Sequence, residues 1–292
     1  MAKLTASKGR YINPLTDYGF KRIFENEKLL INFLNSALGL KNKIVTLQYQ
    51  NVEQKGRTKT GRSSFFDLHC TTGKGEYIII EMQNMSQPFF KDRVLYYSTF
   101  PIQKQAKKGK WDFKLNPVYS VNILDFTISE DSDSYHHSVQ LMDVKSKRVF
   151  YDKLTLLFIE LADFNKSEEE LKTVYDRWLY ILKNLPRLQD MPAVMKKDRI
   201  FMELFEEAEI ANMTPEELDL YDQSLKDYCN MNTPKDIVAL WEKEVATLSK
   251  DVAVLSKTIA AKDIRIAELE RRLGLTGTSA KLTRQRRAPA KA

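Results

Sequence analysis

The 292-residue sequence contains only two cysteines, Cys70 and Cys229, and lacks any long apolar run. Two cysteines 159 positions apart, with no CxxC pair, exclude a disulfide framework and a structural zinc cluster. The first ten residues lack the apolar stretch of a signal peptide. The longest apolar runs, 77–80 and 156–159, are too short to span a membrane. We therefore expect a reduced, cytoplasmic protein with no membrane segment.

The charge of the chain is divided among three segments. The total is +7, from 46 basic and 39 acidic side chains, with apolar residues at 43%. Residues 1–110 carry a net +11, residues 111–275 a net −9 and residues 276–292 a net +5. The apolar share indicates a globular protein. The charge segregation indicates that the front half and the tail suit an anionic partner.

Apolar spacing predicts an alternation of helices and strands in the front half. Residues 17–38 are predicted to be helical with a break near Asn26, and Gly39 is a typical helix stop. The remaining front-half elements are strands at 44–52, 65–72 and 76–83, a helix at 89–108, and strands at 118–126, 139–142 and 154–161. Helical patterns follow, beginning after Ser167, Thr214 and Thr233.

This order predicts an α/β fold with a mixed sheet flanked by helices. We divide the chain into a core at 11–165, a helical region at 166–235, a coiled coil at 236–273 and a basic disordered tail at 274–292.

The strands at 65–72 and 76–83 carry two carboxylates that a tight hairpin would bring together. If residues 73–75 form a three-residue turn, Asp67 lies opposite Glu81, and Gln83 shares their face. A two-residue turn would instead place Asp67 opposite Ile80.

Like charges directly opposed in a sheet are destabilising. A divalent cation held by hard oxygen ligands would offset that repulsion, and Mg²⁺ (or Mn²⁺) is the natural choice. The alternative is a pair of carboxylates at the sheet margin, solvated or paired with lysines.

Asp67 and Glu81-Met82-Gln83 resemble the Asp…Glu-x-Lys signature of the PD-(D/E)xK nuclease superfamily. The chain is more closely similar to the recombination-promoting nuclease, transposase-like branch of that superfamily. Further runs carry this resemblance over residues 13–126. They are Pro14-Leu15-Thr16-Asp17-Tyr18-Gly19-Phe20-Lys21-Arg22-Ile23-Phe24, Phe33-Leu34-Asn35, Arg93-Val94-Leu95-Tyr96-Tyr97, and Asn116-Pro117-Val118 leading to Ile123-Leu124-Asp125-Phe126.

The resemblance implies a restriction-endonuclease-like core and a metal-dependent DNA endonuclease linked to recombination or transposition. Asp67 and Glu81 would be the metal ligands, with Gln83 as the third catalytic residue. Gln83 stands where the superfamily has lysine, and glutamine can orient a water but cannot act as a base. Phe66 replaces the proline of the signature, which removes no ligand.

Several side chains around this hairpin have both a functional and a structural interpretation. The basic loop Lys55, Arg57, Lys59 and Arg62 either contacts DNA phosphates or is a solvated loop. Arg93 either reaches a phosphate or has a structural role, because Leu95, Tyr96 and Phe100 around it are predicted to be core. His69 is either near a metal or a hydrogen-bonded strand histidine. Lys104, Lys107, Lys108 and Lys110 either complement a helix C-terminus or contact DNA.

The C-terminal region shows a heptad repeat. Apolar residues recur every seven positions from Val238 to Leu273, and a second series three positions later is broken by Lys262. This pattern predicts a parallel coiled coil and hence a homodimer. The alternative is a long amphipathic helix packed on its own domain.

We therefore expect a Mg²⁺-dependent DNA endonuclease whose partners are DNA and a second copy of the chain. Three rivals stay open on the same sequence. They are a catalytically inactive DNA-binding module, a coiled-coil interaction protein on the same fold, and a defence or toxin nuclease with the same chemistry.

Overall fold

The computed structural model describes residues 9–50, 53–54, 64–65, 68–128, 134–231, 256 and 258–274. The chain divides into two compact units, residues 1–233 and 234–292. Predictions for Asp67, the basic loop at 55–62, the helix start after Thr233 and the tail beyond 274 lie outside the described residues. The domain boundaries within 11–235 stay a prediction.

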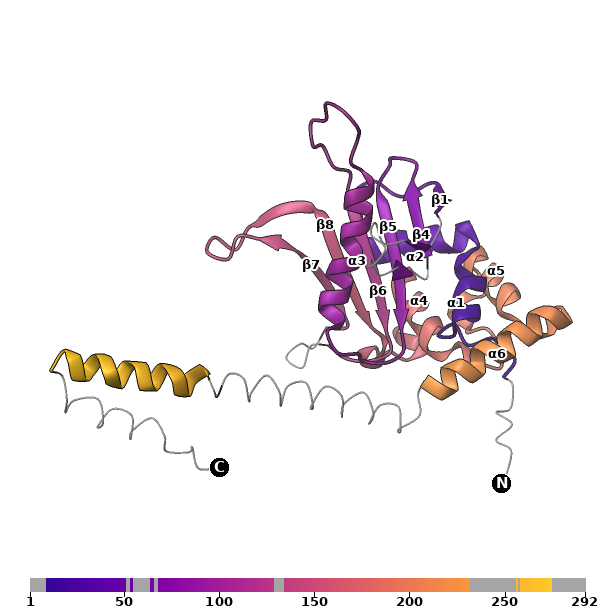
Figure 1. Ribbon diagram of the computed structural model, residues 1–292. Coiled ribbons are helices and arrows are strands. Elements are labelled where there is room, and N and C mark those ends of the chain that lie inside the picture. The colour runs from indigo at the N-terminus through magenta and orange to yellow at the C-terminus, as the bar shows by residue number, and fades with distance from the viewer. Residues whose placement is uncertain are drawn as a thin grey trace, which may run out of the picture. The chain divides into compact units, whose positions relative to one another are not determined.

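A six-stranded mixed sheet forms the centre of the first unit, with the order β1-β4-β5-β6-β8-β7 (Figure 1). β5, β6 and β8 are parallel, and β1, β4 and β7 are antiparallel to their neighbours. The strands are β1 Leu47–Tyr49, β4 Leu68–Thr72, β5 Tyr77–Gln83, β6 Val118–Leu124, β7 His136–Met142 and β8 Val149–Glu160. A separate ladder pairs β2 Glu53–Gln54 with β3 Ser64–Phe65.

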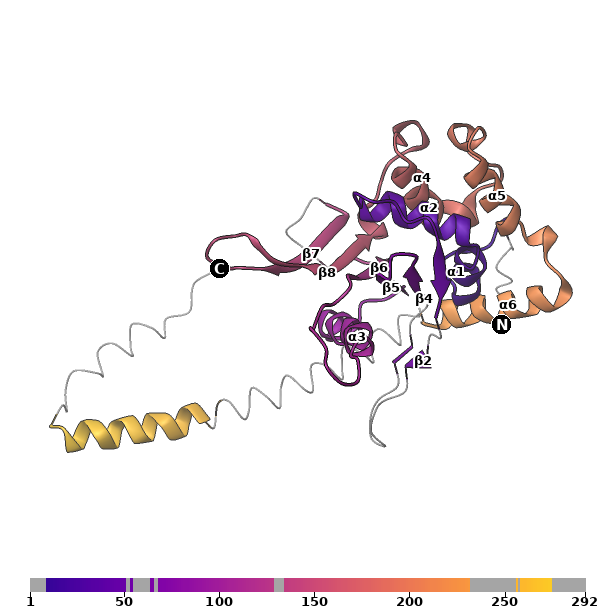
Figure 2. The same ribbon diagram turned by 90° about the horizontal axis from the view of Figure 1, so that it is seen from above.

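Helices cover both faces of the sheet, as predicted. Figure 2 shows α3 on one face and α1, α2, α4 and α5 on the other. The helices are α1 Asp17–Phe24, α2 Glu27–Leu38, α3 Phe90–Lys104, α4 Val174–Asn184, α5 Arg199–Ala208 and α6 Pro215–Met231. Single 3₁₀ turns lie at Leu161–Asp163, Glu168–Glu170, Leu185–Arg187, Ala193–Met195 and Ile210–Asn212.

The predicted break near Asn26 is confirmed, and its cause is a cap. The Asn26 side chain accepts hydrogen bonds from the backbone N–H groups of Lys28 and Leu29, at 3.1 and 3.4 Å. These bonds satisfy backbone N–H groups at the start of α2 that have no acceptor within the helix. At the other end, Gly39 has φ 56°, a left-handed conformation that ends the helix.

Two hydrophobic cores lie on the two faces of the sheet. The larger contains Phe24, Phe33 and Trp178 together with Ile78 and Ile80 of β5. The smaller lies under α3 and contains Phe90, Val94, Leu124 and Phe158. Because side chains alternate along a strand, the residues between Ile78, Ile80 and Met82 face α3.

Several predicted element bounds differ from the structure. The strand predicted at 44–52 is reduced to β1 among the described residues, and 65–72 contributes both β3 and β4. α3 ends at Lys104, not 108. The start signal at Ser167 produces only one 3₁₀ turn, and α4 begins after its own cap, Thr173.

The prediction that Leu95 and Tyr96 are core is wrong. They are 50% and 49% exposed. The face of α3 that packs on the sheet consists of Phe90, Val94, Ser98 and Pro101. Those residues recur at three- and four-residue spacing and so share one side of the helix. Leu95 and Tyr96 lie outside this spacing, on a side of α3 that does not pack on the sheet.

The second unit is helical over residues 258–272. Ile259, Ile266, Leu269 and Leu273 of the heptad pattern are exposed there. The helix is thus observed, and its pairing with a second copy stays a prediction. Among the described residues, no helix is long and apolar enough to cross a membrane.

Candidate active site

The β4–β5 hairpin has the predicted three-residue turn. The N–H of Thr72 donates to the carbonyl of Glu76 at 2.9 Å, and the N–H of Gly75 donates to the carbonyl of Thr72 at 2.8 Å. Gly75 has φ 80°, which favours glycine. Leu68 pairs with Ile80, so the two-residue alternative is excluded over the described residues.

Glu81 and Gln83 lie on the face of β5 that points toward α3. The Gln83 Nε2 donates to Glu81 Oε2 at 3.5 Å, the limit of a hydrogen bond. Glu81 is only 5% exposed. A carboxylate so far from solvent is costly unless it is compensated by hydrogen bonds or positive charge.

Two residues of α3, Tyr97 and Arg93, are connected electrostatically with the Glu81 side of the sheet. Burial raises the pKa of the Tyr97 hydroxyl, Glu81 raises it further, and Arg93 opposes the rise. Arg93 also donates through Nη1 to Gln87 and lies 5.4 Å from the centroid of the Phe90 ring. Its Nη2 is buried with no hydrogen-bond partner among the described residues. The Tyr97 hydroxyl is therefore under the electrostatic influence of both Glu81 and Arg93.

Asn122 of β6 is a member of this site that the sequence reasoning missed. It is the parallel neighbour of Glu81 and is fully buried. Its Nδ2 donates to the carbonyls of Leu157 and Ser120, at 3.1 and 3.2 Å. Its Oδ1 is buried without a hydrogen-bond partner in the described part of the chain. Asparagine is rare in strands, yet Asn122 lies inside the strand sequence Val-Tyr-Ser-Val-Asn-Ile-Leu. This unusual placement is the sequence feature that could have identified Asn122 as a site residue.

His69 lies on the same face, opposite Ile79 and only 1% exposed. Burial, aided by Lys104, lowers its pKa to about 4, so the ring is neutral at pH 7. The ring centroid lies 6.3 Å from that of Tyr77. Burial beside an aromatic ring favours the interpretation as a packed strand histidine.

The oxygen atoms around Glu81 suit a hard divalent cation. Glu81 supplies a carboxylate, and Asn122 and Gln83 supply amide oxygens, the donor types that Mg²⁺ accepts. Within the described residues no group of three His, Cys, Asp or Glu side chains could hold a metal ion. The second predicted carboxylate, Asp67, lies outside that part of the chain.

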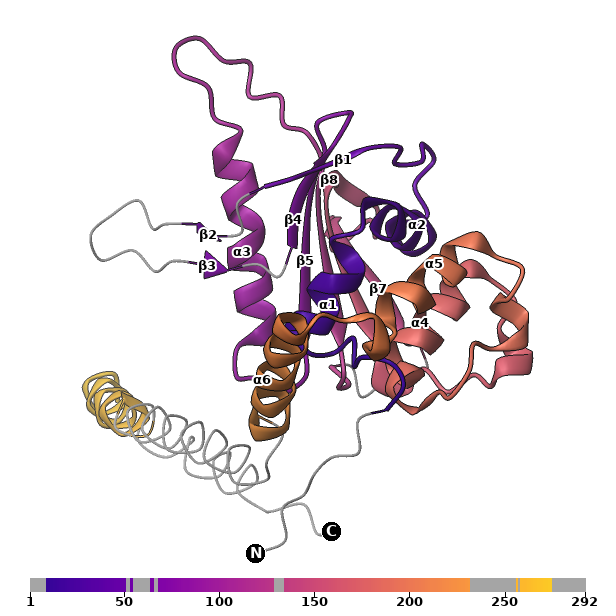
Figure 3. The ribbon, with the colours of Figure 1, turned by 90° about the vertical axis from the view of Figure 1, so that its right-hand side faces the viewer.

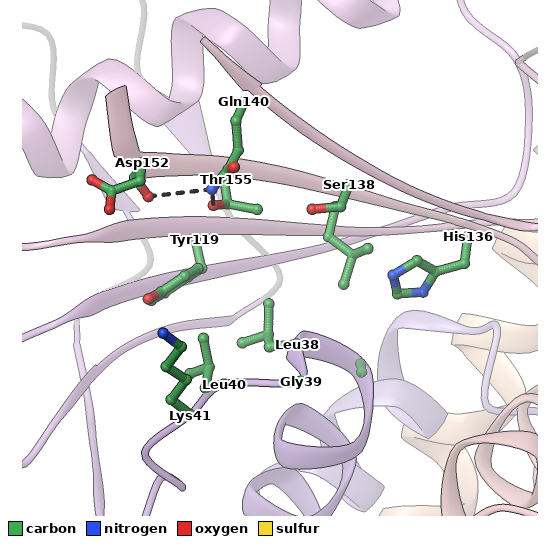
Figure 4. A pocket seen from close by; sticks show the side chains of 12 residues that line it. Leu38, Gly39, Leu40, Lys41, Tyr119, His136, Ser138, Gln140, Asp152 and Thr155 are labelled. Carbon is green, nitrogen blue, oxygen red and sulfur yellow. Dashed lines mark hydrogen bonds between the residues drawn. The ribbon is translucent and has the colours of Figure 1, made fainter. Parts of the chain in front are cut away.

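A polar pocket lies on the opposite face of the sheet (Figure 4). It is lined by the end of α2 and by β6, β7 and β8, with Gln140 donating to Thr155 Oγ1 at 3.0 Å. His136, at its margin, is bonded to the Tyr175 hydroxyl at 2.8 Å. Among the residues that the structure describes, none of the predicted site residues lines this pocket, and Asp152 is its only carboxylate.

The order of the elements and the polar site on β5 both fit one family. A family model described as PD-(D/E)XK nuclease family transposase matches residues 14–236. The chain belongs to this family. The match spans every labelled element from α1 to α6, so the nuclease resemblance extends well past residue 126. No curated protein and no solved structure matches the chain.

The sequence blocks shared with the nuclease family have structural causes. In the first block, a Cβ on Gly19 would lie 2.1 Å from the carbonyl oxygen of Asn13, so only glycine fits. In the second block, Asn35 donates to the carbonyl of Ile44 and accepts from its N–H, at 2.9 and 2.8 Å. The side chain of Asn84, just after β5, donates to the carbonyl of Leu15 at 2.8 Å. The first block is thus fixed to the strand that carries Glu81.

Proposed function

We propose that this member of the nuclease family is a metal-dependent DNA endonuclease that hydrolyses phosphodiester bonds during recombination or transposition. Asp67 and Glu81 would hold Mg²⁺ or Mn²⁺. The observation that carries the proposal is the register of β4 and β5. Asp67 directly precedes Leu68, and a ladder continued by one residue beyond the pair Leu68–Ile80 would set Asp67 opposite Glu81.

Each polar group around Glu81 has a role in this reaction. A bound divalent cation lowers the pKa of its water and neutralises charge that develops on the phosphate. The Gln83 amide would orient the attacking water, since glutamine cannot take its proton. The buried Nη2 of Arg93 would donate to a phosphate oxygen, the interaction for which a guanidinium is best suited.

Asn122 would support the cation site at Glu81. Its Nδ2 is anchored to the backbone of β6 and β8, which fixes the amide plane. The Oδ1 would then be available as an oxygen donor toward a cation held by Glu81.

Nicking of a supercoiled plasmid with Mg²⁺ or Mn²⁺ tests the proposal. The wild type should nick, and Asp67→Ala and Glu81→Gln should each lose activity by at least about 100-fold. Asp219→Asn, an exposed carboxylate on α6, is the matched control and should nick normally. Equal activity of Asp67→Ala and wild type would overturn the assignment. DNA binding without cleavage under either metal would favour the inactive DNA-binding module instead.

We also propose that two copies pair through a parallel coiled coil over residues 236–273. The exposed Ile259, Ile266, Leu269 and Leu273 on the helix of the second unit support this. A dimer would bring two active sites to one DNA, which suits cutting of both strands.

A further inference from the structure

The segment between α3 and β6 projects past the end of the sheet (Figures 1 and 3). Its two ends are tied together. Gln105 accepts from the N–H of Asn116 at 2.6 Å and donates to the Asn116 carbonyl at 3.3 Å. Lys153 of β8 donates to the carbonyl of Leu115 at 2.9 Å. These hydrogen bonds therefore hold both ends of the segment 106–115 in place.

Two aromatic rings sit together on this projecting segment. The ring centroids of Trp111 and Phe113 are 4.7 Å apart and the ring planes differ by 31°. Phe113 is 75% exposed, and neither ring belongs to the two cores of the sheet. Phe113 also has φ 57°, a left-handed conformation that is strained for an aromatic residue.

Four lysines flank the two rings in the sequence. Lys107, Lys108, Lys110 and Lys114 accompany one acid, Asp112, whose carboxylate accepts from the N–H of Lys114. None of these four lysines forms an ion pair within the described residues. Since α3 ends at Lys104, they lie beyond its last turn, where the helix dipole no longer accounts for them.

We propose that residues 105–117 form a platform for single-stranded nucleic acid. Unpaired bases would stack on Phe113 and Trp111, and the lysines would contact the phosphates between them. Exposed aromatic rings interleaved with lysines are the combination that binds single strands without sequence preference. A duplex hides the faces of its bases, so stacking selects the single strand.

The position of the platform connects it to the site at Glu81, and this part of the inference rests on the proposed function. Pro117, at the end of the platform, accepts from the N–H of Tyr77 at 2.9 Å, and Tyr77 precedes Glu81 by four residues on β5, a rise of about 13 Å. A strand leaving the site toward Tyr77 would reach the platform within a few nucleotides. The platform would thus hold one strand of a nicked or opened duplex.

Binding to a labelled 20-nucleotide oligothymidine, measured by fluorescence anisotropy in EDTA, tests the platform without cleavage. Replacing both rings, Trp111→Ala with Phe113→Ala, should weaken binding by at least about tenfold, the effect of losing a stacked base. Phe113→Trp should retain binding. Phe150→Ala, which removes an 81% exposed ring from the β7–β8 hairpin, is the matched control and should bind as wild type does.

Four outcomes would overturn the platform. The first is that wild type does not bind the oligonucleotide, and the second is that the double variant binds it as well as wild type does. The third is that the double variant loses as much affinity for a duplex of the same length as for the single strand, and the fourth is that it loses self-association in light scattering instead of binding. The first three are read without metal, so they are independent of nuclease activity. A chain that binds the strand through this loop but nicks no plasmid would contradict the proposed function alone.

Discussion

Glu81 on β5 and Asn122 on β6 are neighbours in a parallel ladder and both face α3. We expect Asn122→Leu to weaken Mn²⁺ binding by about 10- to 100-fold, as loss of a supporting group does at metal sites. Isothermal titration calorimetry measures this directly. Ser98→Ala, an equally buried position on α3 whose hydroxyl donates to the Leu95 carbonyl, should leave the affinity unchanged. An unaltered affinity of Asn122→Leu would remove Asn122 from the site.

Gln83 should matter for its polarity and not for its size. Gln83→Leu should lower plasmid nicking by about 100-fold, because no group then orients the water. Gln83→Lys, which introduces the residue typical of the superfamily, should retain nicking. Nicking by Gln83→Leu at the wild-type rate would exclude Gln83 from catalysis.

Metal binding should stabilise the fold through Glu81. At a metal concentration 100 times the Kd, the free energy of unfolding should rise by about 2.7 kcal/mol. Thermal melting with and without Mn²⁺ measures this, and Glu81→Gln should show no increase. A metal-dependent increase in this variant would place the cation elsewhere.

Asp176 should dominate the acid sensitivity of the helical layer. Its carboxylate accepts from Lys166 at 2.6 Å and from the N–H of Thr173 at 2.9 Å. Burial raises the pKa of Asp176, but these bonds outweigh burial and hold the pKa below its usual range. The stabilisation is therefore present above the unfolded-state pKa of about 3.9 and is lost as pH falls through the lower folded value.

Asp176→Asn should consequently lower the free energy of unfolding by about 2 kcal/mol at pH 7, and by less at pH 3. Urea unfolding at the two pH values measures both quantities. Asp219→Asn should change stability by less than about 0.5 kcal/mol at either pH. An equal effect of Asp176→Asn at both pH values would contradict the electrostatic explanation.

The coiled-coil proposal predicts a mass near twice 34.0 kDa in light scattering. Ile259→Asp with Ile266→Asp should give a monomer, because both heptad positions would carry repelling charges in a dry seam. Arg271→Asp, also exposed but outside the two apolar series, should remain dimeric. A monomeric wild type would reject the coiled coil.

The sequence by itself determined the order of helices and strands in the front half. The apolar spacing and the caps at Asn26 and Gly39 are local signals, and they specified α1 and α2 correctly. The glycines at 73 and 75 indicated a tight turn, but both a two-residue and a three-residue turn stayed open. The structure decided between them, because the pairing of Leu68 with Ile80 requires the three-residue turn.

Only the tertiary structure decided which residues share the site. Asn122 lies beside Glu81 because β6 pairs with β5, and Glu81 raises the pKa of Tyr97 on α3, so the candidate site is built from segments far apart in sequence. For the same reason Leu95 and Tyr96 proved exposed, since the rotation of a helix on a sheet depends on the whole packed face. Burial, and with it the neutral state of His69, is a property of that assembled layer and not of any local run.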